Sequence, residues 1–133
     1  MKDFTLYPEA LELKQLGFDE PCFAFYQVEY HENSPIMVDD NEQYRRTGFR
    51  TCINSEIASH YTSCPTYSQA FRWFREKHSL GHMINGIGYE SFIMNIGGIL
   101  HIFNGSEFNT YEEVELRCLK HLIKTVKENE NQI

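Results

Sequence analysis

The sequence predicts a two-layer α+β domain, in which about three helices pack mainly on one face of a mostly antiparallel sheet of about four to five strands. Three segments have apolar residues at helical spacing, each with capping signals at its ends. Short apolar and aromatic runs with turn residues between them predict strands. The chain shows no regular strand–helix alternation and no internal repeat. At 133 residues it is the usual size of one domain, so we expect residues 1–133 to form a single domain.

The first predicted helix covers residues 6–16. Thr5 precedes it as the expected N-cap, and Pro8 lies in the first turn, where its missing N–H leaves no helical bond unmade. Gly17 should end the helix in a left-handed conformation, with Phe18 packing back on the last turn.

An aromatic-rich strand is predicted over residues 22–30. The first half of this segment is apolar at both alternating positions, which is typical of a central strand. Residues 31–64 then have irregular punctuation, with short strands plausible only at 36–38 and 49–53. This segment is either a functional loop or an unrecognised hairpin.

The clearest helix covers residues 67–78. Thr66 and Gln69 have the spacing of a capping box at its start. The apolar side of this helix should face the core. Trp73 lies far from the centre of that apolar side, so we expect a partly exposed indole.

Residues 82–103 predict a β-meander. Glycines separate three apolar stretches, at 82–85, 89–96 and 99–103, and a tight turn at Gly97 and Gly98 joins the last two.

The last predicted helix begins after Thr110, which has Glu113 three residues on as a second capping box. Its apolar residues cover more than half the circumference and need a sheet or two neighbours to bury them. We expect the tail at 128–133 to fray.

Composition favours a folded, cytoplasmic protein. Hydrophobic residues make up 41% of the chain and aromatic residues 14%, which is too high for a disordered chain. No run of eighteen apolar residues and no signal-peptide pattern occur, so no membrane contact is expected. The four cysteines are spaced 30, 12 and 54 residues apart, which indicates reduced, mostly buried thiols. They are Cys22, Cys52, Cys64 and Cys118.

The acidic net charge of −7 is unevenly distributed. Residues 1–40 hold two basic residues against nine acidic ones, whereas residues 41–81 hold six against three. The basic segment could form a patch for an anion or an acidic partner, or could pair with the acidic N-terminal third. Its arginines are Arg45, Arg46, Arg50, Arg72 and Arg75.

We find no catalytic, metal or cofactor motif, so none of these is expected. Cys64 precedes a helix and has His60 nearby, but the simpler interpretation is a small residue covering the helix start. Glu115 falls inside the apolar face of the last helix. It either pairs with Arg72 or Arg75 or binds a ligand.

Trp73 with Arg72 and Arg75 could form a binding interface, because Trp and Arg concentrate at binding hot spots. They could equally cover an edge of the domain. The acidic net charge and the absence of a recognition motif argue against nucleic acid as the partner.

Three segments together resemble a group of small uncharacterised proteins encoded by phages and prophages of Bacteroidetes bacteria. They are ALELKQLGFDEPC at 10–22, PTYSQAFRWFREK at 65–77 and TYEEVELRCLKHLI at 110–123. The resemblance covers roughly a third of the chain. It implies a phage-type origin and carries no activity, cofactor or site residue with it.

The first functional hypothesis is therefore an accessory, non-enzymatic binding protein that contacts a host or phage macromolecule, most simply a protein. A small protein or enzyme binding a nucleotide-like anion through the basic segment at 45–77 is the alternative. A structural homo-oligomer is the third possibility.

Overall fold

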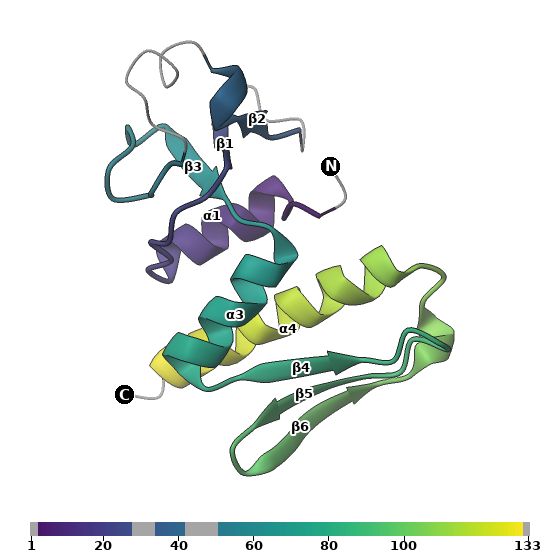
Figure 1. Cartoon of the computed structure of the whole chain (residues 1–133). Helices are drawn as coiled ribbons and strands as arrows, with labels where there is room; N and C mark the ends of the chain where they lie inside the picture. The colour runs from purple at the N-terminus through teal and green to yellow at the C-terminus, as the bar shows by residue number, and fades with distance from the viewer. Residues whose placement is uncertain (1–2, 28–33, 42–50, 132–133) are drawn as a thin grey trace. The chain divides into compact units, whose positions relative to one another are not determined.

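The computed structural model describes residues 3–27, 34–41 and 51–131 of the chain and confirms the α+β class (Figure 1). The chain divides into two compact units, Met1–Ser68 and Gln69–Ile133. The described strands form two antiparallel sheets of three strands each, so the prediction of one sheet of four to five strands is wrong. Each strand pairs within its own half of the chain, because partners close in sequence lose less entropy on pairing. The single-domain expectation stays a prediction.

The described residues of unit 1 form one helix and a small sheet in which β1 is the central strand, as predicted. The elements are α1 (Tyr7–Gln15), β1 (Ala24–Gln27), β2 (Ile36–Met37), the 3₁₀ turn η1 (Val38–Asp40) and β3 (Tyr61–Cys64). β1 pairs with both neighbours, in the registers Ala24↔Met37 and Ala24↔Cys64. Helix α1 packs on β3.

The start of α1 differs from the prediction, whereas its end confirms it. Leu6 is the N-cap and makes no side-chain bond. Thr5 is instead buried, and its Oγ1 donates to the carbonyl of Pro65 at 3.0 Å, because the bridge beside it draws this segment against residues 65 and 66. At the other end Gly17 has φ +97°, and the Phe18 N–H donates to the Leu13 carbonyl at 2.9 Å.

In the described part of residues 31–64, β2 and β3 each pair with β1 and not with each other, and the choice between a functional loop and a hairpin stays a prediction. β3 was not predicted, yet it forms the longer of the two pairings of β1. The strand expected at 36–38 is β2. Of the strand expected at 49–53, only an isolated bridge between Cys52 and Cys22 is present, and residues 49–50 lie outside the described residues.

Unit 2 contains the predicted meander and two helices (Figure 1). The elements are α3 (Tyr67–His78), of which the residues from Gln69 on belong to this unit, β4 (Gly81–Ile84), β5 (Ser91–Asn95), β6 (Gly98–Phe103), the 3₁₀ turn η2 (Gly105–Glu107) and α4 (Tyr111–Glu130). The strand order is β4-β5-β6, and α4 packs on β4 and β5. A bulge between Ile93 and Met94 shifts the register of β5 and β6.

The expectation of a partly exposed Trp73 is wrong. Its side chain is only 5% exposed, and the indole meets Phe74 edge-on at 5.1 Å and His78 at 4.8 Å. Neighbouring rings cover more of the α3 circumference than the apolar stripe alone indicates, and such edge contacts suit an indole.

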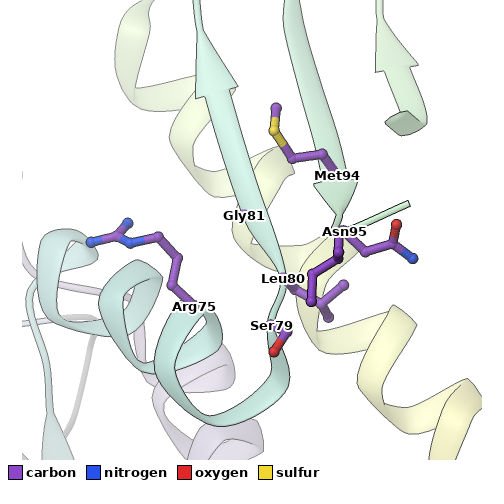
Figure 2. A pocket seen from close by; sticks show the side chains of 7 residues that line it. Arg75, Ser79, Leu80, Gly81, Met94 and Asn95 are labelled. Atoms are coloured by element: carbon purple, nitrogen blue, oxygen red, sulfur yellow. The ribbon is translucent and has the colours of Figure 1, made fainter. Parts of the chain in front are cut away.

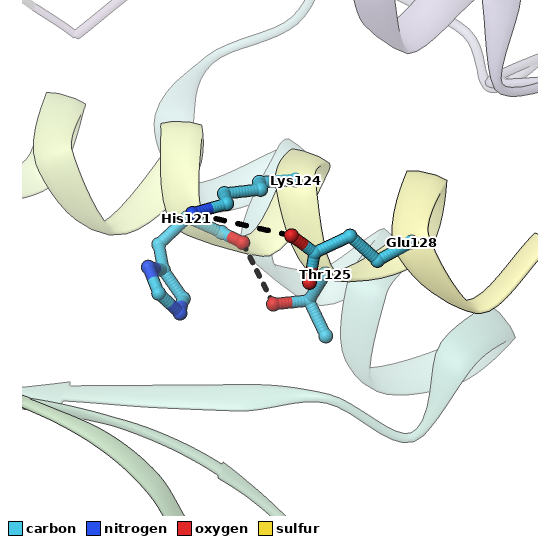
Figure 3. A network of polar contacts seen from close by, with 4 residues as sticks. All are labelled: His121, Lys124, Thr125 and Glu128. Carbon is cyan, nitrogen blue, oxygen red and sulfur yellow. Dashed lines mark hydrogen bonds and ion pairs between the residues drawn. The ribbon is translucent and has the colours of Figure 1, made fainter. Parts of the chain in front are cut away.

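Helix α4 has the predicted cap but a longer end. Thr110 Oγ1 accepts the Glu113 N–H at 3.2 Å, and the Glu113 carboxylate accepts from the N–H of Asn109, one residue before the capping-box position. The helix continues to Glu130, and the expected fraying of residues 128–133 stays a prediction. Lys124 and Glu128 form an ion pair at 4.0 Å in the last turns (Figure 3).

Candidate functional site

The sheet of unit 2 has two faces in opposite environments. Residues that pair across strands share a face. Ser91, Ile93 and Phe103 are buried on the inner face, where α4 packs. His101 of the same face stacks on His121 of α4 with a ring separation of 4.4 Å. The opposite side, here called the outer face, consists of Met83, Phe92, Met94, Ile99 and Ile102.

The outer face is a contiguous apolar surface. Met83, Phe92 and Ile102 form one row across the three strands, and Met94 with Ile99 forms part of the next. Met83, Ile99 and Ile102 are each 57% exposed, while Phe92 and Met94 are half-buried. Cross-strand neighbours lie about 5 Å apart, so these side chains form one continuous patch.

Two further apolar side chains stand at the turns of the meander. Ile96, in the turn between β5 and β6, is 92% exposed, and Ile87, in the turn between β4 and β5, is 87% exposed. Single exposed apolar residues are ordinary on a protein surface, but a contiguous group of them marks an interaction site. The two turn residues extend the apolar character of the meander to both ends of the sheet.

The outer face has almost no charge around it. Residues 81–103 contain Glu90 as their one charged residue. Unit 2 as a whole holds seven Lys and Arg against eight Asp and Glu, a net charge of −1, whereas unit 1 holds five against eleven, a net charge of −6. The acidic character of the chain therefore belongs to unit 1.

Charged side chains stand at the two ends of this sheet. Glu90 is exposed immediately before β5, and strand alternation places it on the same side as Phe92. At the opposite end, Arg75 of α3 lines a pocket of about 330 Å³ (Figure 2). The other lining residues are Ser79, Leu80, Gly81, Met94, Asn95 and Ile96. The pocket thus adjoins the outer face through Met94.

This pocket is a poor anion site. It lies at the C-terminal end of α3, where the carbonyl dipoles repel negative charge. Arg75 is the one cation among its lining residues. Burial and the charge of Arg75 lower the pKa of nearby His82 to about 4, so that imidazole is neutral and adds no positive charge.

The binding residues predicted from the sequence do not gather in one site among the described residues. Arg45, Arg46 and Arg50 lie outside those residues. Arg72 and Arg75 are exposed on α3, whereas Trp73 between them is in the core. The buried indole offers little surface to a partner, and the interface at Trp73 stays a prediction. Glu115 is half-buried on α4, and its charge raises the pKa values of Tyr111 and Cys118, although burial is the larger cause for both.

The cysteines are inert in this fold. Burial raises the pKa of Cys22 and of Cys52 to about 12, and that of Cys64 and of Cys118 to about 11. The four thiols are free and buried. A thiol with such a pKa is almost fully protonated at neutral pH, which opposes the nucleophilic interpretation of Cys64.

Metal-binding groups and membrane spans are absent from the part of the chain that the structure describes. Within residues 3–27, 34–41 and 51–131, His, Cys, Asp and Glu side chains form no group of three that could hold a metal ion. No helix in those ranges has the length and apolar character to cross a bilayer.

Sequence reasoning missed the outer face, although a signal was present. The segments at 92–94 and 99–103, apart from His101, are apolar at both alternating positions, which indicates strands with two apolar faces. The sequence predicts only two helices in this half of the chain, α3 and α4, that could cover the sheet. Only the packed structure shows that α4 covers just one of the two faces of this sheet.

Comparison of the chain with protein-family models, with curated proteins and with solved structures found no match.

Proposed function

We propose that this chain is a non-enzymatic protein-binding protein, and that the outer face of unit 2 is its binding surface. The uncharged row of Met83, Phe92 and Ile102, in which Met83 and Ile102 are exposed, is the observation that carries the proposal. Burying apolar surface is the main driving force of protein association, at about 25 cal/mol for each Å² removed from water.

The alternative of an anion-binding protein has weaker support. Its three N-terminal arginines lie outside the described residues, and Arg75 stands at a helix end whose dipole repels anions. A protein surface rich in Ile and Met and poor in charge suits a protein partner better than a phosphate or a nucleotide.

The proposal keeps the phage-type origin and the cytoplasm of a bacterial host as its setting. In that setting the partner is a host or phage protein, and the chain acts by occupying it. Nucleic acid is an unsuitable partner for the outer face, because that face offers no cation to contact phosphates.

A capture experiment with matched variants tests the proposal. The full chain, Ile102→Lys and Phe23→Lys are immobilised and exposed to bacterial lysate, and bound proteins are identified by mass spectrometry. Ile102 is 57% exposed on the outer face and Phe23 is 52% exposed in unit 1, so the two substitutions are alike in cost to the fold. The wild type and Phe23→Lys should retain a protein that Ile102→Lys loses. Equal capture by all three chains would refute the outer face as the binding surface.

A further inference from the structure

We propose that Asn85 is a site of spontaneous deamidation, at which the backbone nitrogen of Gly86 attacks the Asn85 side-chain amide and water converts the product to an acidic residue. The sequence offers two Asn-Gly pairs, Asn85-Gly86 and Asn104-Gly105, and the fold leaves the first of them much freer to react. The reaction is independent of the proposed function.

The chemistry of this site needs only the chain and water. The Gly86 nitrogen bonds to Cγ of Asn85, and the Cγ–Nδ2 bond breaks as ammonia leaves with the amide proton, which closes a succinimide ring. Water then adds to either ring carbonyl and opens the ring, leaving aspartate or isoaspartate at this position. Glycine suits the attacking position because it has no Cβ to hinder the nitrogen and turns freely about its backbone bonds.

Three turns in the described residues of unit 2 hold an asparagine in the same way and differ in the residue that follows. The Oδ1 atoms of Asn85, Asn95 and Asn104 each accept the N–H two residues on, at 2.9, 2.8 and 3.1 Å. Such a donor stabilises the negative charge that develops on Oδ1 when Cγ is attacked. Asn95 is followed by Ile96, whose branched side chain crowds the attacking nitrogen, so this turn should be inert.

Packing separates the two Asn-Gly pairs. Gly86 is exposed, and a Cβ placed on it would have no neighbour within 4 Å. Gly105 is half-buried, and a Cβ placed there would overlap the backbone carbonyl of Gly88 and lie 2.9 Å from the Glu90 nitrogen. A ring that closes at Asn104 must move the Gly105 backbone against these neighbours, whereas Gly86 moves into solvent.

The two sites are otherwise closely matched. The carbonyl of Asn85 accepts the Tyr89 N–H at 3.1 Å, and that of Asn104 accepts the Glu107 N–H at 3.2 Å. Both asparagines are exposed. The turn after Asn85 also holds Tyr89 at φ 60°, a left-handed conformation that disfavours a non-glycine residue, so this turn opens more readily than an unstrained one.

Deamidation would change the charge of the meander. It adds one negative charge to the chain's −7, within residues 81–103, where Glu90 is the one charged residue. In the aspartate product the carboxylate can still accept the Ile87 N–H, so the turn should persist.

Peptide mapping by mass spectrometry tests the inference on the full chain in mildly alkaline buffer. Asn85 should convert to aspartate and isoaspartate, while Asn95 stays intact. Asn104 should convert at least roughly tenfold more slowly than Asn85, which corresponds to a barrier about 1.4 kcal/mol higher. In urea, where the packing of Gly88 on Gly105 is lost, both Asn-Gly pairs should convert at equal rates. Equal rates in the folded chain, or an Asn85 that stays intact while the unfolded chain loses it, would overturn the inference.

Two exposed positions supply matched variants. In Gly86→Ala the methyl group has room and the backbone is not left-handed, so the fold should persist. The loss of Asn85 should slow by roughly tenfold in this variant, and isoelectric focusing should show less of the acidic product. Ile96→Gly replaces a side chain that is 92% exposed and should make Asn95 reactive. An unchanged rate at Asn85 in the first variant, or at Asn95 in the second, would contradict the role given to the following residue and overturn the inference.

Discussion

The two units differ in where they place polar and apolar groups. Unit 1 buries Thr5, Glu9, Thr62 and Ser63 and three of the four thiols, whereas Ser91 is the one buried polar residue of unit 2 among the described residues. Of the large apolar side chains that are exposed in the described residues, all except Phe23 belong to unit 2.

Hydrogen bonds satisfy part of the polar interior of unit 1, although Thr62 Oγ1 has no hydrogen-bond partner among the described residues. The Tyr26 hydroxyl donates to the Thr5 carbonyl at 2.6 Å. The amide of Asn54 donates to the Phe18 carbonyl at 2.9 Å and accepts the Ser63 N–H at 2.8 Å. Satisfied buried polar groups fix one arrangement of a small sheet. Unit 2 reaches a stable core with apolar packing and has apolar side chains left over, which is why we place the binding surface there.

Matched truncations of one core leucine in each unit should give the largest change in the free energy of unfolding. Leu13 in α1 and Leu119 in α4 are both fully buried, so Leu13→Ala and Leu119→Ala should each lower the free energy of unfolding by about 3 kcal/mol. Urea unfolding measures the loss.

Thiol labelling then shows whether the units open separately. Leu13→Ala should expose Cys22, Cys52 and Cys64 to alkylation while Cys118 stays protected, and Leu119→Ala should do the reverse. Simultaneous labelling of all four thiols in both variants would show that the chain unfolds as one body, and the contrast would then be one of composition alone.

Acid should weaken unit 2 through His82. Burial, with a smaller contribution from Arg75, lowers the pKa of His82 from 6.5 to about 4, and its buried Nδ1 has no partner among the described residues. The unfolded chain therefore binds a proton that the folded chain resists, so stability is complete above the unfolded pKa and falls below it. Between about pH 7 and about pH 5 the loss should be about 2 kcal/mol.

His82→Phe is the matched variant for this effect. The new ring can keep the stacking on Phe71, which the imidazole makes at 3.6 Å, but it cannot take up a proton. Urea unfolding at both pH values should show a smaller acid loss in the variant than in the wild type. An equal loss in the two proteins would assign the acid sensitivity to other groups.

Removing one hydroxyl should test the polar core of unit 1. Tyr26→Phe deletes the donor to the Thr5 carbonyl and should cost about 1 kcal/mol, measured by thermal or urea unfolding. Because Tyr26 is buried and the ring is retained, packing changes little. A variant as stable as the wild type would show that the hydrogen bond does not stabilise this core.

Substitutions at the helix ends should give the smallest change in stability. Helix α1 of unit 1 is followed by Gly17 at φ +97°, whereas α3 of unit 2 is followed by Ser79 at φ 53°. Ser79→Gly should stabilise the chain by about 0.5 kcal/mol, since relief of left-handed strain exceeds the entropy that glycine adds to the unfolded chain. Gly17→Ser should cost about 1 kcal/mol in the opposite direction. Thermal unfolding of the two variants compares them, and shifts of the same sign would contradict this account.

The helices and the meander were open to prediction because their signals are local. Helical apolar spacing, the glycine after residue 16 and the Thr110 cap act over a few residues, and the structure shows helices at all three predicted places. The glycine turn likewise determines the pairing of β5 with β6, since Asn95 faces Gly98 across it.

Tertiary structure alone decided which faces are covered. The division into two sheets, the pairing of β3 with β1, the burial of Trp73 and the bond from Thr5 to Pro65 all join residues whose environments no local pattern describes. The outer face belongs to the same class, because strand periodicity shows that both sides of a strand are apolar but not which side a helix covers. Burial is a property of the whole packing, and local sequence determines only which side chains are available for it.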